Sequence, residues 1–293
     1  MLPKISVIIP TYNDTTYLNK AINSVLKQKY PKNKYEIIIV DGSINDNIYN
    51  LYKMKYSKYK IIRYIRKRGC NLPEALNIGI KNMRGTFFKQ LDTDDLLMRG
   101  SLRTYDYYAT KNPNFLIFYS DAYIIDKKSR IINKKEERTF KSVEELAKAL
   151  WKGPIGYPSS YLINKNAFDL VGTFDPKNKQ AEDWEWRIKA AFINKLRFYH
   201  IKKPLIAYRV HENQKSTLEM RTNSIYLYKM KKRLASEIKE KTKGESFEQI
   251  LKVSLIKAVT SFVKKNIEIT FKLNKNRIYR RFMSKIEEKF GSV

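Results

Sequence analysis

The sequence predicts an α/β protein, with a mostly parallel sheet flanked by helices and a basic helical extension at its C-terminal end. Residues 5–10 and 35–40 are continuous apolar, largely β-branched runs, which is typical of strands buried on both faces of a parallel sheet. Between them, the apolar residues of 18–26 recur with helical spacing. A third helix and strand follow at 48–56 and 60–65. Strands that alternate with helices in this way imply right-handed crossovers and parallel pairing.

The later elements extend this pattern to about residue 214. We expect helices at 74–82, 143–150, 167–171 and 182–192, strands at 86–91, 115–119, 161–163, 196–201 and 205–210, and a hairpin of 122–125 with 130–133. The Gly- and Pro-rich stretch 151–160 is predicted to be a loop outside the core, and loops on rigid scaffolds often carry function. Long basic helices are predicted after the sheet, so we divide the chain into a domain of residues 1–216 and a helical region of residues 217–293.

Composition restricts the class of protein. A hydrophobic content of 43% is sufficient for a core and argues against a disordered chain. The sequence contains no apolar run long enough to span a bilayer, and its N-terminus leads into a strand without a signal-peptide pattern. The single cysteine, Cys70, excludes a disulfide within the chain. We therefore expect a cytoplasmic protein.

The net charge of +30 indicates an anionic partner. Such a field attracts nucleic acid, anionic lipid headgroups or phosphorylated substrates without choosing among them. An apolar stripe runs through residues 250–283 among many lysines and arginines. This stripe is typical of a helical subdomain that packs on its own or on the preceding domain, of a helix lying on an anionic membrane surface, or of a partner-binding segment. All three interpretations stay open.

An acidic cluster follows the strand predicted at 86–91. Asp92, Asp94 and Asp95 lie within four positions, and carboxylates this close repel one another unless a cation or hydrogen-bond donors compensate. The C-terminal end of a buried strand is where α/β sheets bind ligands, and Mg²⁺ and Mn²⁺ favour oxygen ligands shared with phosphate. The cluster therefore indicates either a metal–diphosphate site or a helix N-terminus, where aspartate is also favoured.

Several separated stretches carry a resemblance through their order and spacing. They are residues 6–13, 24–28, 36–43, 69–85, 91–95, 174–183 and 208–213. Together they resemble the family-2 glycosyltransferases, whose nucleotide-sugar-binding fold is called GT-A. The resemblance covers about residues 4–216 and implies an inverting enzyme that moves a sugar from a nucleoside-diphosphate sugar, with UDP-sugars favoured, to a hydroxyl group of a glycan or lipid-linked acceptor. It gives no guidance on residues 217–293.

The same resemblance implies roles for individual side chains. Asp94 resembles the metal ligand of the family's DxD motif, and His211 a further ligand, for Mn²⁺ or Mg²⁺. Asp183 resembles the base that removes the proton of the acceptor hydroxyl. The residues implied to bind the donor nucleotide are Pro10, Thr11, Tyr12, Asp41, Arg68, Asp92 and Thr93.

Each of these residues also has a structural interpretation. Asp183 and Asp95 could cap helices, Asp41 could belong to an Asp-Gly turn, and a histidine at position 211 could simply pack. Arg66 is close enough to exchange roles with Arg68.

Two other functions compete with the transferase. A nucleotidyltransferase needs a Gly- and Lys/Arg-rich loop after its first strand, and residues 10–14 lack one. A basic protein that keeps a non-catalytic GT-A shell and binds nucleic acid or membrane is the second alternative. A degenerate shell should have lost some of Asp92, Asp94, Asp183 and His211, so nucleic acid is not the expected partner. An anionic membrane surface, reached through the C-terminal helices, is the additional partner that we expect.

Overall fold

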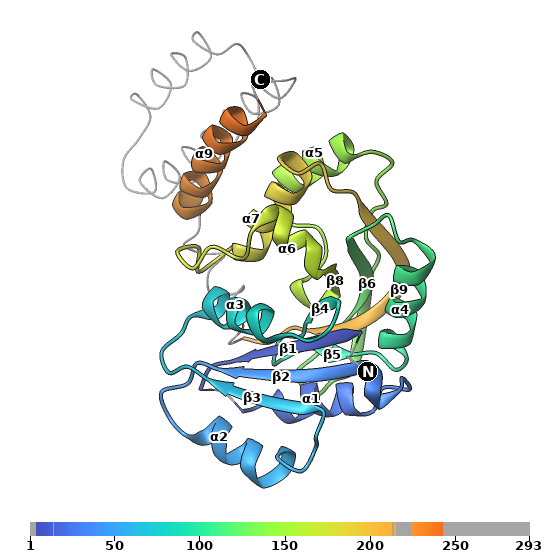
Figure 1. Cartoon of the computed structure of the whole chain (residues 1–293), viewed down its shortest axis with the longest axis vertical. Helices are drawn as coiled ribbons and strands as arrows, with labels where there is room; N and C mark the ends of the chain where they lie inside the picture. The colour runs from blue at the N-terminus through green and yellow to red at the C-terminus, as the bar shows by residue number, and fades with distance from the viewer. Residues whose placement is uncertain (1–3, 14, 213, 215–223, 243–293) are drawn as a thin grey trace, which may run out of the picture. The chain divides into compact units, whose positions relative to one another are not determined.

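The computed structural model describes residues 4–13, 15–212, 214 and 224–242 (Figure 1). The chain forms two compact units, Met1–Lys215 and Ser216–Val293. The first unit contains the sheet and all the residues predicted to form the site.

Four parallel strands form the first half of the sheet. They are β1 (Ile5–Thr11), β2 (Tyr35–Asp41), β3 (Ile62–Arg66) and β4 (Phe87–Gln90), in the order β3-β2-β1-β4. Every residue of β1, β2 and β4 is buried, as the apolar runs predicted. The chain changes winding direction at β1, between β2 and β4, and such a switch point is where open α/β sheets bind ligands.

The second half of the sheet is mixed. It contains β5 (Leu96–Leu97), β6 (Ile117–Ile125), β7 (Ile131–Lys135), β8 (Tyr161–Asn164) and β9 (Phe198–Arg209). β6 and β9 pair in parallel, whereas the pairs β4–β8, β6–β8, β5–β9 and β6–β7 are antiparallel. The predicted parallel pairing therefore holds for the first four strands and for β6–β9. Among the antiparallel pairs, only β6–β7 is joined by a tight turn.

Helices cover the sheet and connect its strands. They are α1 (Leu18–Leu26), α2 (Asn47–Leu51) with a π-helical turn at Tyr52–Tyr56, α3 (Leu72–Asn82), α4 (Ser101–Lys111), α5 (Val143–Lys152), α6 (Lys165–Val171) and α7 (Glu182–Phe192). Helix α3 packs along β1 and β2, and α5 packs against α7 (Figure 1). Gly79 lets α3 approach the sheet, because a Cβ atom there would lie 2.4 Å from Cγ2 of Ile8.

The structure corrects four of the sequence predictions. The strand predicted at 115–119 and the hairpin strand predicted at 122–125 form one strand, β6. Trp151 belongs to α5 and is buried, so the loop begins only after Lys152. The two strands predicted at 196–201 and 205–210 are one strand, β9, because a register shift opposite Asp121 bends the strand without breaking it. Helix α4 was not predicted, since its buried face is formed by Leu102, Tyr105 and Ala109 among polar neighbours.

The second unit is described only at α9 (Ser224–Lys241). Met230, Leu234 and Ile238 lie on one face of this helix and are buried. The apolar stripe predicted at 250–283 lies outside the described residues. Across the described parts of the chain, none of the helices combines the length and the apolar character needed to cross a membrane.

Candidate active site

Three neighbouring strand ends bring polar side chains to one edge of the sheet. Thr11 of β1 is in register with Asp41 of β2, and Asp41 is in register with Arg66 of β3. β1 and β4 remain paired only as far as Ile8 and Gln90, so the sheet opens beyond that point. Parallel pairing therefore places the predicted nucleotide-binding residues beside the acidic cluster that follows β4.

Asp41 is fully buried at this edge. Its Oδ1 accepts hydrogen bonds from the Ser43 backbone N–H at 2.8 Å and from the Thr11 hydroxyl at 3.4 Å, and its Oδ2 accepts one from the Tyr64 hydroxyl. Burial and the bond to Asp41 raise the pKa of Tyr64. Asp41 therefore orders the end of β2, and a nucleobase that contacts it would have to share or replace one of these donors.

The two nearby arginines differ in position. The Nε of Arg66 lies 3.9 Å from Oδ2 of Asp41, and its Nη1 lies 2.6 Å from Asp46. Arg68 is 62% exposed and contacts Asp46 at 3.0 Å. The structure thus brings Arg66, and not Arg68, next to Asp41, as the sequence left open.

Pro10 and Tyr12 flank Thr11. Pro10 is buried within β1, whereas the Tyr12 side chain is 55% exposed and its Cδ2 lies 3.3 Å from where a Cβ of Gly42 would be. The same Cβ would lie 2.6 Å from the Cys70 carbonyl oxygen, so only glycine fits between these groups. Tyr12 therefore presents an open aromatic face beside the Asp41 edge.

The acidic cluster forms a turn between β4 and β5. The backbone N–H of Asp92 donates to Ser159 Oγ at 3.0 Å, and Asp92 Oδ1 accepts from the Gln90 amide at 2.7 Å. Thr93 is half-buried in the same turn. The helix N-terminus interpretation is wrong here, because the next helix, α4, begins at Ser101.

Asp94 and His211 come together although they are far apart in the sequence. The Nε2 of His211 lies 3.2 Å from Oδ2 of Asp94. One carboxylate and one imidazole suit Mn²⁺, and the carboxylate also suits Mg²⁺. No group of three or more His, Cys, Asp or Glu side chains arranged to hold a metal occurs among the described residues. A cation held by this pair would therefore need further ligands such as diphosphate oxygens or water.

The buried Arg209 side chain and backbone hold the turn that carries Asp94 and Asp95. Arg209 is fully buried, its backbone N–H donates to Asp95 Oδ1 at 3.0 Å, and its Nε donates to the Asp94 carbonyl oxygen at 2.8 Å. Its guanidinium carbon lies 4.3 Å from the centre of the Tyr17 ring, which in turn lies 5.3 Å from the His211 ring. Asp95 therefore has the structural role expected of one member of the cluster, although it caps no helix.

Lys89 lies behind the acids on β4. It is fully buried, and its Nζ donates to the Ser159 and Gln90 carbonyl oxygens. Burial lowers the pKa of Lys89 to about 7, although the carboxylates of Asp95 and Asp92 oppose this shift. Burial and the charge of Asp94 raise the pKa of Asp92 to about 7, and burial with the charges of Asp94 and Asp92 raises the pKa of Asp95. The cluster thus carries a charge that one buried lysine compensates only in part.

Asp183 lies in the first turn of α7. The N-cap is Ala181, so Asp183 does not cap the helix, although its charge is favourable at this end. Its Oδ2 bonds to Arg187, and no described residue donates to its Oδ1. Its charge also contributes to the raised pKa of Asp92, so these two carboxylates interact.

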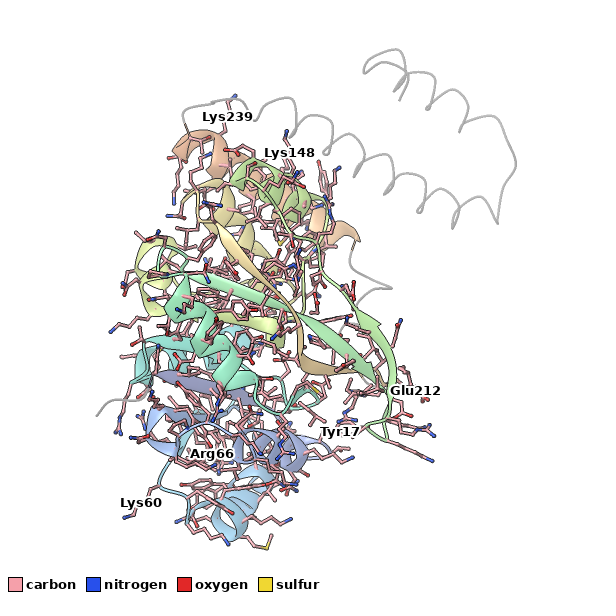
Figure 2. The ribbon with its side chains drawn as sticks, turned by 90° about the vertical axis from the view of Figure 1, so that its right-hand side faces the viewer. Tyr17, Lys60, Arg66, Lys148, Glu212 and Lys239 are labelled. Carbon is pink, nitrogen blue, oxygen red and sulfur yellow. The ribbon has the colours of Figure 1, made fainter. Side chains whose placement is uncertain are left out.

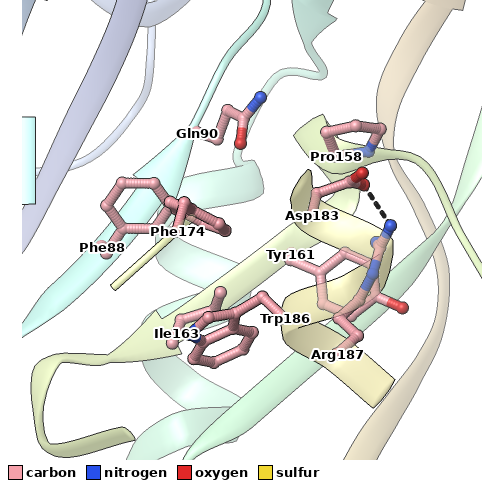
Figure 3. Close-up of a pocket in the computed structure, with 9 residues that line it drawn as sticks. All are labelled: Phe88, Gln90, Pro158, Tyr161, Ile163, Phe174, Asp183, Trp186 and Arg187. Atoms are coloured by element: carbon pink, nitrogen blue, oxygen red, sulfur yellow. Dashed lines mark hydrogen bonds and ion pairs between the residues drawn. The ribbon is translucent and has the colours of Figure 1, made fainter. Parts of the chain in front are cut away.

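A small pocket opens beside Asp183 (Figure 3). Its lining residues are Phe88, Gln90, Pro158, Tyr161, Ile163, Phe174, Asp183, Trp186 and Arg187. Gln90 lines this pocket and also donates to Asp92, so the pocket beside Asp183 adjoins the acidic turn. The indole of Trp186 donates to the Gly172 carbonyl oxygen at 2.7 Å and that of Trp184 to the Leu150 carbonyl oxygen at 2.7 Å, and both side chains are buried.

Sequence reasoning assigned no role to Arg209, Lys89 or Arg187. Lys89 interrupts an apolar strand just before the acids, and a charged residue in such a strand was the available signal. Arg209 lies within the stretch that carried the resemblance, but its partners Asp94 and Asp126 are 115 and 83 residues away in the sequence.

Known proteins with similar sequences agree with this architecture. The family model described as Glycosyl transferase family 2 matches residues 6–172, more than half of the chain. An uncharacterized glycosyltransferase of Rickettsia typhi is 31% identical over 215 residues, which are 72% of this chain and 65% of that protein. The matched part thus spans slightly less than two thirds of this relative. Poly(ribitol-phosphate) beta-N-acetylglucosaminyltransferase TarP of Staphylococcus aureus is 35% identical over 136 residues, 45% of this chain and 40% of TarP.

Solved structures show the same fold. TarS 1-349 of S. aureus in complex with UDP-GlcNAc aligns with a TM-score of 0.67 and 19% identity, over 93% of this chain and 76% of that chain. The mannosyltransferase PcManGT from Pyrobaculum calidifontis in complex with GDP-Man and Mn²⁺ aligns with a TM-score of 0.62 and 14% identity, over 97% of this chain and 79% of that chain. These alignments confirm the predicted GT-A fold. With the match of its family model, the chain belongs to glycosyl transferase family 2.

Proposed function

We propose that this protein is a metal-dependent, inverting glycosyltransferase that moves a sugar from a nucleoside-diphosphate sugar to an acceptor hydroxyl. The observation that carries the proposal is the meeting of Asp94 and His211, 3.2 Å apart, at the sheet edge where Asp92 and Asp183 also interact. Family membership supports the reaction class. The acceptor is a glycan or a lipid-linked sugar, since the family's resemblance implies a hydroxyl nucleophile.

The donor is a UDP-sugar in this proposal. TarS binds UDP-GlcNAc, and TarP is named as an N-acetylglucosaminyltransferase, whereas PcManGT binds GDP-Man. The nucleoside lies along Pro10, Thr11, Tyr12 and Asp41, with Arg66 replacing Arg68 as the nearer cation. Tyr12 offers a ring face for stacking, and its exposure of 55% leaves that face available.

Asp94 and His211 hold the divalent cation, Mn²⁺ or Mg²⁺, in this assignment. When bound, the cation supplies positive charge that stabilises the diphosphate as it leaves. Asp92 and Thr93 line the ribose and diphosphate region. Arg209 holds the backbone of the turn directly through the Asp94 carbonyl oxygen. Lys89 acts through Ser159, whose carbonyl oxygen it binds and whose Oγ accepts from the Asp92 N–H.

Asp183 is the general base. Arg187 binds its Oδ2 and so orients the carboxylate, while Oδ1 stays available to take the proton of the acceptor hydroxyl. The acceptor oxygen then bonds to the anomeric carbon as the bond from that carbon to the diphosphate oxygen breaks, and the diphosphate leaves with the electron pair. Attack from the side opposite the leaving group inverts the anomeric configuration.

Substitution of Asp183 tests this assignment. Asp183→Asn keeps the shape but cannot accept the proton, so turnover should fall by at least about a hundredfold while UDP affinity stays nearly unchanged. Thermal-shift screening of nucleotide sugars with Mn²⁺ first identifies a donor. The release of UDP from that donor then measures turnover, and calorimetry measures UDP affinity. The exposed Asp169→Asn is the matched control. Full activity of Asp183→Asn would refute the role of the base.

A further inference from the structure

A hairpin projects from the sheet beside the acidic turn. We call residues 126–135 the basic hairpin: it consists of the turn that follows β6 and the strand β7. All five residues of β7 are exposed, and β7 pairs only with β6 among the described strands. One edge of β7 is therefore open to solvent.

The basic hairpin carries unpaired positive charge at its turn. The amino groups of Lys127 and Lys128 have no partner among the described residues, and both side chains are exposed. Arg130 is 72% exposed, although it pairs with Asp126. Lys20 of α1 adds a fourth cation, since its Nζ lies 3.3 Å from Ser129 Oγ. The turn thus concentrates cations at one point of the surface.

Two large apolar side chains follow the turn without cover. Ile131 is 57% exposed and Ile132 is 59% exposed. Neighbouring residues of a strand point to opposite faces, so both faces of β7 are apolar at this point. Lysines commonly protect an edge strand from pairing, which explains Lys134 and Lys135 but not adjacent exposed isoleucines. Apolar surface left in water is unfavourable, and here the two exposed isoleucines directly follow a cluster of cations, which together form a candidate contact surface.

The basic hairpin is held rigidly next to the candidate active site. The buried guanidinium of Arg209 donates to the Asp126 carbonyl oxygen at 2.8 Å and to Ser129 Oγ at 3.0 Å. The same side chain binds the Asp94 carbonyl oxygen. Figure 2 shows the tip of the hairpin close to Tyr17 and Glu212, which flank this site. Whatever binds the hairpin therefore lies near Asp94 and His211.

We propose that the basic hairpin docks this protein on an anionic lipid surface. Lys127 and Lys128 contact lipid phosphates. Ile131 and Ile132 enter the boundary between headgroups and acyl chains, because the basic hairpin meets the bilayer with the open edge of β7. A soluble polyanion would use the cations and leave both isoleucines in water, whereas an anionic bilayer satisfies both. The inference does not depend on the transfer reaction, and the docked orientation brings the site to the headgroups, where a lipid-linked acceptor would lie.

Vesicle binding by the full chain tests the proposal. The measurement is co-sedimentation with vesicles of phosphatidylglycerol and phosphatidylcholine in equal amounts, compared with phosphatidylcholine alone. The variants are Lys127→Gln/Lys128→Gln and Ile131→Ser/Ile132→Ser. The matched control is Lys55→Gln/Lys60→Gln, two exposed lysines on the α2–β3 side, where Figure 2 labels Lys60 away from the hairpin.

We expect the wild type to bind the anionic vesicles only, and the lysine variant to lose about 30-fold in partition coefficient. The isoleucine variant should lose about tenfold, and the control should match the wild type. Circular dichroism and thermal unfolding show whether each variant is folded. Wild-type protein that ignores anionic vesicles, or hairpin variants that bind like the wild type, would overturn the proposal. A concentration-dependent dimer lost in the isoleucine variant, without vesicle binding, would assign the surface to a second copy and also overturn it.

Discussion

At the scale of single residues, the folded chain disfavours the charged forms of two carboxyl groups in the site, those of Asp92 and Asp95. Burial and the charges of Asp94 and Asp92 raise the pKa of Asp95, and buried Lys89 compensates the cluster only in part. Perturbed carboxylates of this kind are common where a protein holds a cation or does acid–base chemistry. The position of Asp92 therefore costs stability in the protein without a cation.

The stability of Asp92→Asn as a function of pH tests this cost. The folded-state pKa of Asp92, about 7, is above its ordinary 3.8, so the folded protein holds the proton more tightly and loses stability as pH rises through that window. With metal removed by a chelator, the free energy of unfolding of Asp92→Asn at pH 8 should exceed that of the wild type by about 2 kcal/mol. This value is discounted for the solvent near the half-buried Asp92 side chain. Urea unfolding should show that the gain disappears near pH 4. A variant less stable than the wild type at pH 8 would contradict the account, and Asp169→Asn is the control.

At the scale of secondary-structure elements, one buried arginine joins β9, the acidic turn and the basic hairpin. Arg209 donates to backbone oxygens of Asp94 and Asp126 and receives support from the ring of Tyr17. These partners belong to segments that lie far apart in the sequence. The arginine thus sets the distance between the candidate metal ligands and the hairpin.

Loss of this arginine should loosen both segments together. Arg209→Met removes the donors but keeps most of the volume, so the free energy of unfolding should fall by about 3 kcal/mol. Urea unfolding measures the loss, and hydrogen exchange should show faster exchange at 126–130. Arg130→Met, on an exposed side chain of the same hairpin, should change little. If Arg209→Met, like the control, lowers the free energy of unfolding by less than about 1 kcal/mol, Arg209 does not hold the acidic turn and the basic hairpin together.

The contact of α3 with β1 makes a separate prediction. Gly79→Ala would place a Cβ 2.4 Å from Ile8 Cγ2, so α3 must shift away from the sheet. The strain should exceed the helix propensity gained by alanine and lower stability by about 1–2 kcal/mol. Gly153→Ala is the matched control, because nothing lies within 4 Å of its Cβ position. A thermal midpoint unchanged or raised in Gly79→Ala would show that the helix accommodates the methyl group.

At the scale of the whole molecule, the sequence predicted the parallel half of the sheet because buried parallel strands are continuous apolar runs with helices between them. It predicted the pair of Asp94 and His211 through resemblance to the family, and the structure brings the two together. It could not predict the contacts of Arg209 or the choice of Arg66 over Arg68 beside Asp41. Those depend on how segments more than twenty residues apart meet, which local patterns do not encode.

The second half of the sheet shows the same limit. Antiparallel pairing of β4 with β8 joins Phe88 to Ile163, 75 residues further along the chain, and no local signal marks it. The short strand β5 has only two residues and pairs with β9 far along the chain. The edge of the site formed by these strands is therefore known only from the structure.

The central claim is that Asp94 and His211 create a cation-dependent site for a nucleoside diphosphate. Calorimetric titration of UDP into the full chain, with Mn²⁺ and with a chelator, tests it most directly. We predict that removal of Mn²⁺ lowers UDP affinity by at least about tenfold, and that His211→Ala removes most of the effect of the metal while the fold stays intact. UDP binding of equal strength with and without Mn²⁺, or an unchanged metal effect in His211→Ala, would contradict the account.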